Sequence, residues 1–381
     1  MKKHLIAAAA LAAALPAAHA VDMKAGDWTV SLGGNINAFY TASQCKQASG
    51  TVGGLALGDA ALACGGKDKS TVIGNGLLPS QLSGGAKSTQ NGYDIAAVFT
   101  ISAATATNSA IAQNNVVDVR NAYMTIGNAS MGTFKLGRDY GMFGANAILG
   151  DMTLLGIGAA TRATQNGRVS LGHIGAGYGY LGTYGQMVYS TPSSGGFSAD
   201  VGVYSPVDTT LGAGQVAKDT PQFQGRLNFG TGNFKGWIGA KSQSFGDAGA
   251  VKGFNMSASE IGGSFSSGGF GLIANYQDGK GLGVLSDGDQ GDVKTKHTFV
   301  QGTYKVAANT KMGLSWGRSK NDKNLGAANN LESNENTTAG VYHNITPQIT
   351  LVGEVGETKS KGFNGAQAKQ SSVSFGAIFF F

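Results

Sequence analysis

Residues 28–40 decide the fold, and they read Trp28-Thr29-Val30-Ser31-Leu32-Gly33-Gly34-Asn35-Ile36-Asn37-Ala38-Phe39-Tyr40. The even positions are mostly apolar and the odd positions mostly small or polar, so the segment alternates with a period of two. A strand of about 13 residues exceeds the roughly 5–6 of a soluble sheet, whereas a tilted strand that crosses a membrane needs about 9–11. The pattern predicts a membrane-crossing strand with one apolar and one polar face.

The same alternation recurs along the chain. Residues 93–102 repeat it directly after Asn91-Gly92, a pair that favours a tight hairpin turn. Short connections tend to alternate with long ones, as in barrels with tight periplasmic turns and long outer loops. The segments, among them a strand over 168–179, predict an all-β fold: a 16-stranded antiparallel transmembrane barrel with both termini at one end. The alternative is a secreted sandwich or solenoid, whose strands would be shorter.

The composition agrees with a barrel and excludes several other classes. Glycine contributes 62 of 381 residues, about 16% against a usual share of about 7%. Charged residues make up only 13% and the mean hydropathy is −0.05. Beyond the N-terminus no apolar run reaches the roughly 18 residues of a membrane-spanning helix. A barrel whose strands alternate between lipid-facing and lumen-facing side chains has this averaged hydropathy.

The first 20 residues predict a secretory signal peptide. Lys2 and Lys3 precede an apolar stretch from Leu5 to Leu15, and Ala18-His19-Ala20 forms a small-x-small cleavage site. The mature domain is expected to span residues 21–381. Without Lys2 and Lys3 it keeps 26 of the 28 basic side chains against 22 acidic ones, a formal charge of +4. This small excess does not indicate binding to nucleic acid.

The two cysteines, Cys45 and Cys64, lie in one early segment rich in glycine, alanine and serine. In an oxidising compartment such a pair favours a disulfide that ties a loop, and the alternative is two free thiols. No histidine pair lies nearby, which argues against a zinc site. We therefore expect no metal and no cofactor here.

An enzymatic barrel is not favoured by the sequence. The mature chain keeps His173, His297 and His343, each on a separate expected strand without an adjacent carboxylate pair or nucleophile motif. The acidic residues of 287–292 are compatible with calcium binding, although Asp-Gly-Asp runs are more often solvated loops. The sequence therefore predicts a protein that is not an enzyme.

Four stretches in this order carry a resemblance to a known family. They are Arg120-Asn121-Ala122-Tyr123 leading to Gly132–Arg138, Tyr189–Phe197, Tyr342–Thr346, and the final strand that ends in Phe381. Together they resemble the trimeric general porins of Gram-negative outer membranes, in particular the neisserial and betaproteobacterial branch.

The resemblance implies a homotrimer in the cell outer membrane. Its expected function is a water-filled channel for passive diffusion of small hydrophilic solutes and ions. The expected partners are outer-membrane lipid, lipopolysaccharide and the outer-membrane assembly machinery.

The resemblance also implies a pore constriction. The loop after the fifth strand, here about residues 139–165, is expected to fold inward, with Asp151 at an acidic constriction position. Leu155 stands where general porins often have a second carboxylate, so this constriction would be less acidic. The expected basic residues opposite are Arg120, Arg138, Arg162 and Arg168. Such a set favours anions mildly, although each arginine is also compatible with a solvated or ion-paired strand end.

The C-terminal strand places Phe375, Phe379 and Phe381 at alternate positions. By resemblance these residues form the signal that the assembly machinery recognises. The simpler reading is that they only face lipid, and both roles are compatible.

Two other functions remain open. One is an adhesin or receptor barrel with a plugged lumen, and the other is a substrate-selective channel with stacked aromatic residues or a ladder of charges. Polar inward faces, as at Asn35 and Asn37, favour an open channel, as does the lack of a bulky apolar plug in the expected inserted loop.

Overall fold

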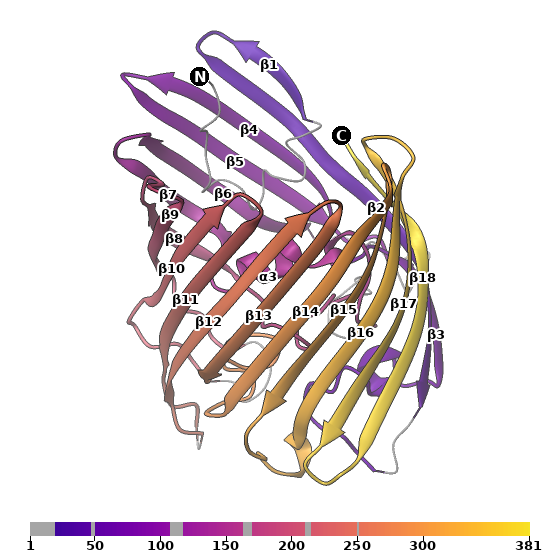
Figure 1. Cartoon of the computed structure of the whole chain (residues 1–381). Helices are drawn as coiled ribbons and strands as arrows, with labels where there is room; N and C mark the ends of the chain where they lie inside the picture. The colour runs from indigo at the N-terminus through magenta and orange to yellow at the C-terminus, as the bar shows by residue number, and fades with distance from the viewer. Residues whose placement is uncertain (1–19, 47–49, 107–116, 163–169, 210–214, 250) are drawn as a thin grey trace.

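The computed structural model describes residues 20–46, 50–106, 117–162, 170–209, 215–249 and 251–381. Almost all regular structure in them is antiparallel sheet (Figure 1). The strands are β1 (Val21–Ala25), β2 (Trp28–Lys46), β3 (Lys69–Gly74), β4 (Ser80–Gln90), β5 (Tyr93–Ala103), β6 (Val117–Asn128), β7 (Gly132–Tyr140), β8 (Thr183–Ser190), β9 (Phe197–Tyr204), β10 (Gln222–Thr231), β11 (Phe234–Phe245), β12 (Phe254–Ser267), β13 (Phe270–Lys280), β14 (Lys294–Ala307), β15 (Thr310–Asn321), β16 (Leu331–Asn344), β17 (Ile349–Gly362) and β18 (Gln367–Phe380). The helical pieces are α2 (Ala60–Ala63), α3 (Ala145–Gly150), η1 (Met152–Leu155) and η2 (Ala327–Asn329).

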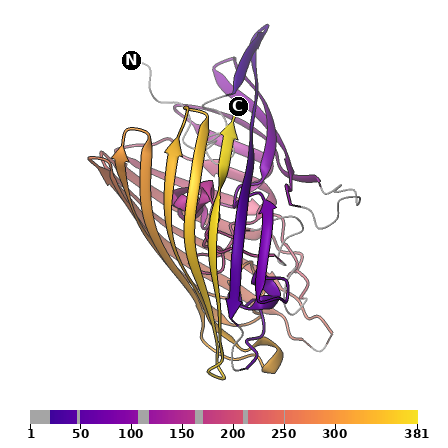
Figure 2. The same cartoon turned by 90° about the vertical axis from the view of Figure 1, so that its right-hand side faces the viewer.

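The sheet closes on itself into a barrel. The last strand, β18, pairs with β2 from Lys369 opposite Lys46 to Phe380 opposite Asn35, and Figure 2 shows these two strands side by side. β3 and β4 pair with successive parts of β2 and share one position in the wall. β1 pairs with the part of β2 that extends beyond the end of β18. The wall therefore has sixteen strand positions, as predicted, with two extra short strands.

Tight turns and both termini of the sheet lie at one end of the barrel. The turn between β4 and β5 consists of Asn91 and Gly92, with φ angles of +50° and +81°. Both residues have positive φ, which a hairpin turn of type I′ requires and which Asn-Gly adopts at low cost. The predicted hairpin is confirmed. The long connections leave from the other end.

Side chains alternate between the two faces of the wall. On β2, Ile36 is 61% exposed on the outer face, whereas its neighbours Asn35 and Asn37 are buried inside the barrel. On β18, Phe375 is 59% exposed on the outside, and Ser374 is buried inside. The outer band is therefore apolar and the inner face mostly polar, as lipid outside and water or polar loops inside require.

The predicted strand over 168–179 is wrong. Residues 163–169 lie outside the described part, and 170–182 form an irregular segment inside the barrel. Gly172 and Gly175 have φ angles of +58° and +78°, which an extended strand cannot contain. Glycines at alternate positions resemble the period-two pattern of a strand in the sequence. In the structure these glycines occupy turns that need positive φ.

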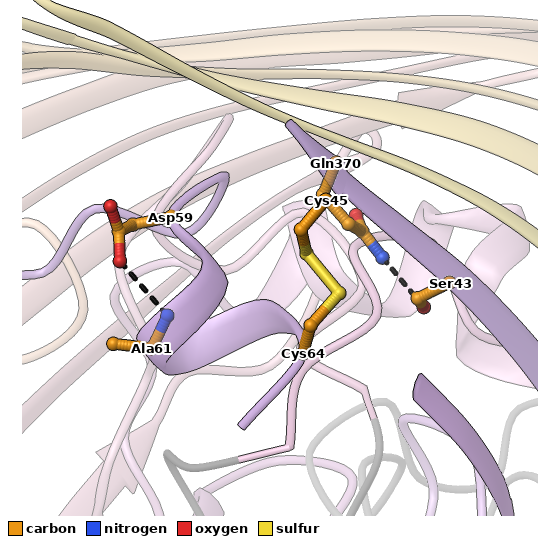
Figure 3. The surroundings of a disulfide bond; sticks show 6 residues. All are labelled: Ser43, Cys45, Asp59, Ala61, Cys64 and Gln370. Atoms are coloured by element: carbon orange, nitrogen blue, oxygen red, sulfur yellow. Dashed lines mark hydrogen bonds between the residues drawn. A yellow bond between two sulfur atoms is a disulfide. The ribbon is translucent and has the colours of Figure 1, made fainter. Parts of the chain in front are cut away.

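A disulfide joins Cys45, near the end of β2, to Cys64, directly after α2 (Figure 3). Both cysteines are buried. Asp59 accepts a hydrogen bond from the Ala61 N–H at 2.9 Å and so caps the short helix. The disulfide ties the connection between β2 and β3 to the barrel wall.

We predict that Cys45→Ser/Cys64→Ser lowers the free energy of unfolding by about 2–4 kcal/mol, because the unfolded chain gains the freedom of an open loop. Urea unfolding in lipid vesicles, followed by tryptophan fluorescence, measures the change. Wild-type protein treated with a thiol reductant under denaturing conditions is the control and should match the double variant. Equal stability of all three proteins would contradict this role.

Candidate permeation pathway and its inserted loops

The connection between β7 and β8, residues 141–182 and here called L3, folds into the barrel in its described parts, 141–162 and 170–182. Figure 1 shows its helix α3 within the ring of strands. Inward side chains of four strands accept its backbone N–H groups. They are Gln224 of β10 for Met142 and Phe143, Glu260 of β12 for Gly144, Gln301 of β14 for Met152, and Glu354 of β17 for Ile157 and Gly158. A loop placed away from water needs such acceptors, so the polar inner wall anchors L3.

Asp151 lies within L3 at the start of η1. Its carboxylate accepts hydrogen bonds from the Thr153 N–H at 2.8 Å and the Tyr178 hydroxyl at 2.6 Å, and it lies 3.0 Å from Nδ1 of His173. Burial alone would raise the pKa of Asp151, but His173 and these hydrogen bonds hold it below its ordinary value. The side chain is fully enclosed. Asp151 therefore organises L3 instead of facing Arg120 as expected.

Arg120 points into the barrel from β6. A β-bulge explains its direction, because Thr100 pairs with Asn121 whereas Ser102 pairs with Asp118, which leaves one extra residue on β6. The Nε of Arg120 lies 2.6 Å from Asp118, and a terminal nitrogen donates to the Tyr180 hydroxyl at 3.3 Å. The guanidinium thus lies inside the barrel, and its charge is balanced by Asp118 of its own strand.

Of the other predicted arginines, Arg138 and Arg162 do not join Arg120 at a constriction. Arg138 lies on the exposed outer face of β7, between Ala122 and Gly185 of the neighbouring strands, because it shares the parity of the outward Phe134. Arg162 is exposed in L3, and its backbone N–H donates to Leu62 of the β2–β3 connection at 2.7 Å. Arg168 lies outside the described residues.

The described parts of two further connections also fold inward, which the pattern of strands and loops does not predict. The β2–β3 connection, residues 47–68 and called L1, donates the Leu57 N–H to Asn334 of β16 at 3.1 Å. The β13–β14 connection, residues 281–293 and called L6, places Asp287 beside Lys241 of β11 in a buried ion pair. Asp287 also accepts a hydrogen bond from Gln222 of β10 at 3.1 Å.

L6 is held in shape by Asp289. Its carboxylate accepts the backbone N–H groups of Val284, Leu285 and Ser286 at 2.6–2.8 Å. The run 287–292 is thus neither a solvated loop nor a metal cage. Among the described residues, no group of three or more His, Cys, Asp and Glu side chains is placed to hold a metal ion, and no helix is long and apolar enough to cross a membrane.

The three inserted loops meet in an apolar cluster. Leu57 of L1, Leu285 of L6, and Ile174 and Tyr178 of L3 are all buried in it. Tyr178 meets Phe299 of the wall edge to face, with ring centroids 5.4 Å apart. The expectation that no bulky apolar group occupies the lumen is therefore wrong. The signal was present in the sequence, because apolar residues recur in all three connections.

The loops cover the inner wall unevenly. Toward the long-loop end, inward side chains of β11 to β18 are buried, as at Gln277, Ser319 and Gln370. On β4 and β5, inward Gln81 and Asp94 keep partial or full exposure, whereas Thr100 and Ser102 are buried. Within the described residues, the solvated part of the inner wall therefore lies on β4 and β5 toward the tight turn, whereas the inward side chains of β6 are buried.

Near the tight-turn end, three inward lysines lack carboxylate partners among the described residues, whereas inward Lys87 pairs with Asp22. Lys235, Lys305 and Lys311 form no ion pair within the described part of the chain. Lys305 and Lys311 are direct partners across β14 and β15. Nζ of Lys311 lies 5.3 Å from the ring centroid of Tyr342. This end of the lumen is therefore electropositive.

The buried pair Lys241–Asp287 gives a test of how firmly L6 is held. We predict that Asp287→Ala lowers the free energy of unfolding by about 3–5 kcal/mol, because it strands a buried ammonium group. Lys241→Met/Asp287→Leu should cost less than the single change, since no charge is left alone. Urea unfolding in vesicles measures both. Lys252→Met, in the exposed pair with Asp247, is the control and should change little.

Comparison with known proteins agrees with this architecture. A family model described as Gram-negative porin matches residues 7–362. A comparison with curated proteins gives no significant match.

Solved structures share the fold at low sequence identity. The anion-selective porin from Comamonas acidovorans has a TM-score of 0.66 and 17% identity, covering 93% of this chain and 100% of its own. The outer membrane channel DcaP of Acinetobacter baumannii has a TM-score of 0.69 and 16% identity, covering 94% of this chain and 99% of its own. Salmonella typhi OmpF has a TM-score of 0.64 and 12% identity, covering 95% of this chain and 100% of its own. Because the family model spans most of the sequence and the barrel agrees with it, this chain belongs to the Gram-negative porin family.

Proposed function

We propose that this porin lets small hydrophilic solutes and ions diffuse passively across the outer membrane, with a mild preference for anions. The observation that carries the preference is the set Lys235, Lys305 and Lys311, which faces the lumen without carboxylate partners. Cations fixed at a pore entrance raise the local concentration of anions. The similar Comamonas porin is described as anion-selective, which supports the same direction.

The expected constriction residues take a smaller part in this proposal. Asp151 is enclosed, Arg138 lies outside, and the charge of Arg120 is opposed by Asp118. Arg120 remains in the proposal only as a buried cation inside the barrel wall.

The inserted apolar cluster supports a second candidate function, a receptor barrel with an occluded lumen. Three loops that meet at Leu57, Leu285 and Tyr178 leave less open space than L3 alone would. Single-channel recordings separate the two functions. Stepwise conductance supports the channel, and stable insertion without conductance supports the receptor.

The assembly and partners belong to the same proposal. Family membership supports a homotrimer embedded in outer-membrane lipid and lipopolysaccharide, exported by a signal peptide over residues 1–20. Outward Phe375 and Phe379, together with the terminal Phe381, are proposed as the signal for the assembly machinery.

We predict that Lys305→Glu/Lys311→Glu shifts the reversal potential in a salt gradient toward cation preference. The shift should shrink in 1 M salt, where the screening length falls to about 3 Å. Lys296→Glu, on the outer face of the same strand β14, is the matched control and should keep the wild-type selectivity. Identical reversal potentials for all three proteins would show that Lys305 and Lys311 do not determine the ion selectivity.

We predict that deleting Phe381 slows assembly in cells without preventing refolding of the purified chain in detergent. The fraction of heat-modifiable barrel in outer-membrane extracts measures assembly. Phe363→Ala, in the β17–β18 connection, is the control and should assemble normally. Normal assembly of the deletion would leave the terminal aromatic with a lipid-facing role only.

A further inference from the structure

Two lysines are paired directly on the inner wall near the tight-turn end of the barrel. Lys305 of β14 lies opposite Lys311 of β15, and Figure 1 shows these two strands side by side. Both residues share the parity of the buried, inward residues of their strands. Directly paired residues have Cβ atoms about 4.5–5.5 Å apart, and like charges at such positions destabilise a sheet. The pairing therefore costs folding energy unless an anion from outside the chain lies between the two ammonium groups.

The surrounding wall does not supply that anion. Strands β13 to β17 are described throughout, and the one acidic side chain that they turn inward is Glu354. One oxygen of Glu354 accepts a hydrogen bond from the Tyr342 hydroxyl at 2.6 Å, and the other accepts the N–H groups of Ile157 and Gly158 at 2.8 and 2.9 Å. Glu354 is thus engaged in holding L3, and neither lysine has an ion-pair partner among the described residues.

The pair borders an apolar part of the wall. Nζ of Lys311 lies 5.3 Å from the ring centroid of Tyr342, and the side chain of Lys311 is half-buried whereas that of Lys305 is exposed. Tyr342 is buried together with Met152 of L3 in one apolar cluster. An ammonium group beside such a surface is partly shielded from water, so it attracts an anion more strongly than it would in bulk water.

The next inward positions toward the long-loop end are Thr303 and Gly313, which are themselves paired. A Cβ atom at Gly313 would collide with Sδ of Met152, so L3 closes the long-loop side of the lysine pair. The side chain of Thr303 is half-buried, and its hydroxyl has no hydrogen-bond partner among the described residues. Inward residues on one strand repeat every second position, so this hydroxyl lies about 7 Å along the wall from Lys305. The lysine pair thus has a third donor beside it and stays open toward the tight turns.

We propose that Lys305 and Lys311 bind a phosphate group, either inorganic phosphate or the phosphate of a small phosphomonoester, with the Thr303 hydroxyl as a further donor. The proposal rests on the proposed function, because the solute must reach the pair through the lumen, and it names the class of anion that the pair selects. A phosphate group carries about −1.5 to −2 charges at pH 7 and presents three acceptor oxygens. Two ammonium groups match that charge, whereas chloride or a monocarboxylate would leave one of them unbalanced.

The test is isothermal titration calorimetry of the full mature chain, refolded in an uncharged maltoside detergent, with inorganic phosphate at low ionic strength. The wild type should bind phosphate. Lys305→Gln/Lys311→Gln should weaken binding by about tenfold for each lysine, because each change removes a hydrogen bond between charged groups. Lys235→Gln removes an inward cation that faces Ser264 instead of a second lysine, and this matched control should bind like the wild type.

Two further anions identify the group that is recognised. Glycerol phosphate should bind about as tightly as inorganic phosphate if the site accepts phosphomonoesters, and more weakly if it accepts the free ion alone. Malonate carries its two charges on separate carboxylates. Tighter binding of malonate than of either phosphate compound would overturn the assignment to phosphate.

Two results with the variants would also overturn the proposal. One is equal affinity of Lys305→Gln/Lys311→Gln and the wild type for phosphate. The other is an equal loss in Lys235→Gln, which would mean that the whole electropositive end attracts anions without a site at the pair. Circular dichroism and heat-modifiability verify that each variant folds, and removal of opposed like charges should not weaken the fold.

Single-channel conductance of the same proteins is recorded in parallel. Phosphate binding without conductance would refute the channel and leave the site in place. Conductance without phosphate binding would refute the site and leave the channel in place.

Discussion

Every backbone N–H and C=O of a segment that crosses lipid needs a partner within the protein, because hydrocarbon offers none. A flat sheet leaves two edges without partners, so the sheet must close. The pairing of β18 with β2 meets this requirement over the full length from Asn35 to Lys46. Closure separates a lipid-facing surface from an enclosed lumen, and side chains alternate between the two. It also leaves tight turns at one end of the barrel and long connections at the other.

Closure also creates the conditions under which the loops fold inward. Alternation places Gln224, Glu260, Gln301 and Glu354 on the inner wall, where they would line a passage if nothing covered them. In this barrel they accept backbone hydrogen bonds from L3 instead. Much of the inner wall is then buried, while inward side chains of β4 and β5 near the tight turn stay exposed. A polar inner face is thus both a lining for water and a scaffold for inserted chain.

The sequence was sufficient to predict the architecture because alternation is a local property. Residues 28–40 and the Asn91-Gly92 turn needed no knowledge of distant segments, and both predictions are confirmed. The site depended on features that alternation does not reveal. Arg138 faces outward because of its parity with Phe134, while Arg120 faces inward only through a bulge that appears when two strands are paired. The partners of Asp151, His173 and Tyr178, lie in residues 168–179, which the sequence pattern wrongly predicts to be a strand.

The short strand β1 adds one last consequence of geometry. β2 is longer than its partner β18, so its first residues would present an open edge at the rim of the barrel. β1 folds back over that edge, with Val21 opposite Leu32 and Ala25 opposite Trp28. Open edges recruit strands from other chains, and charged residues discourage such recruitment. Asp22 and Lys24 make β1 a short, charged strand at this rim, the kind of edge that discourages pairing with a further strand.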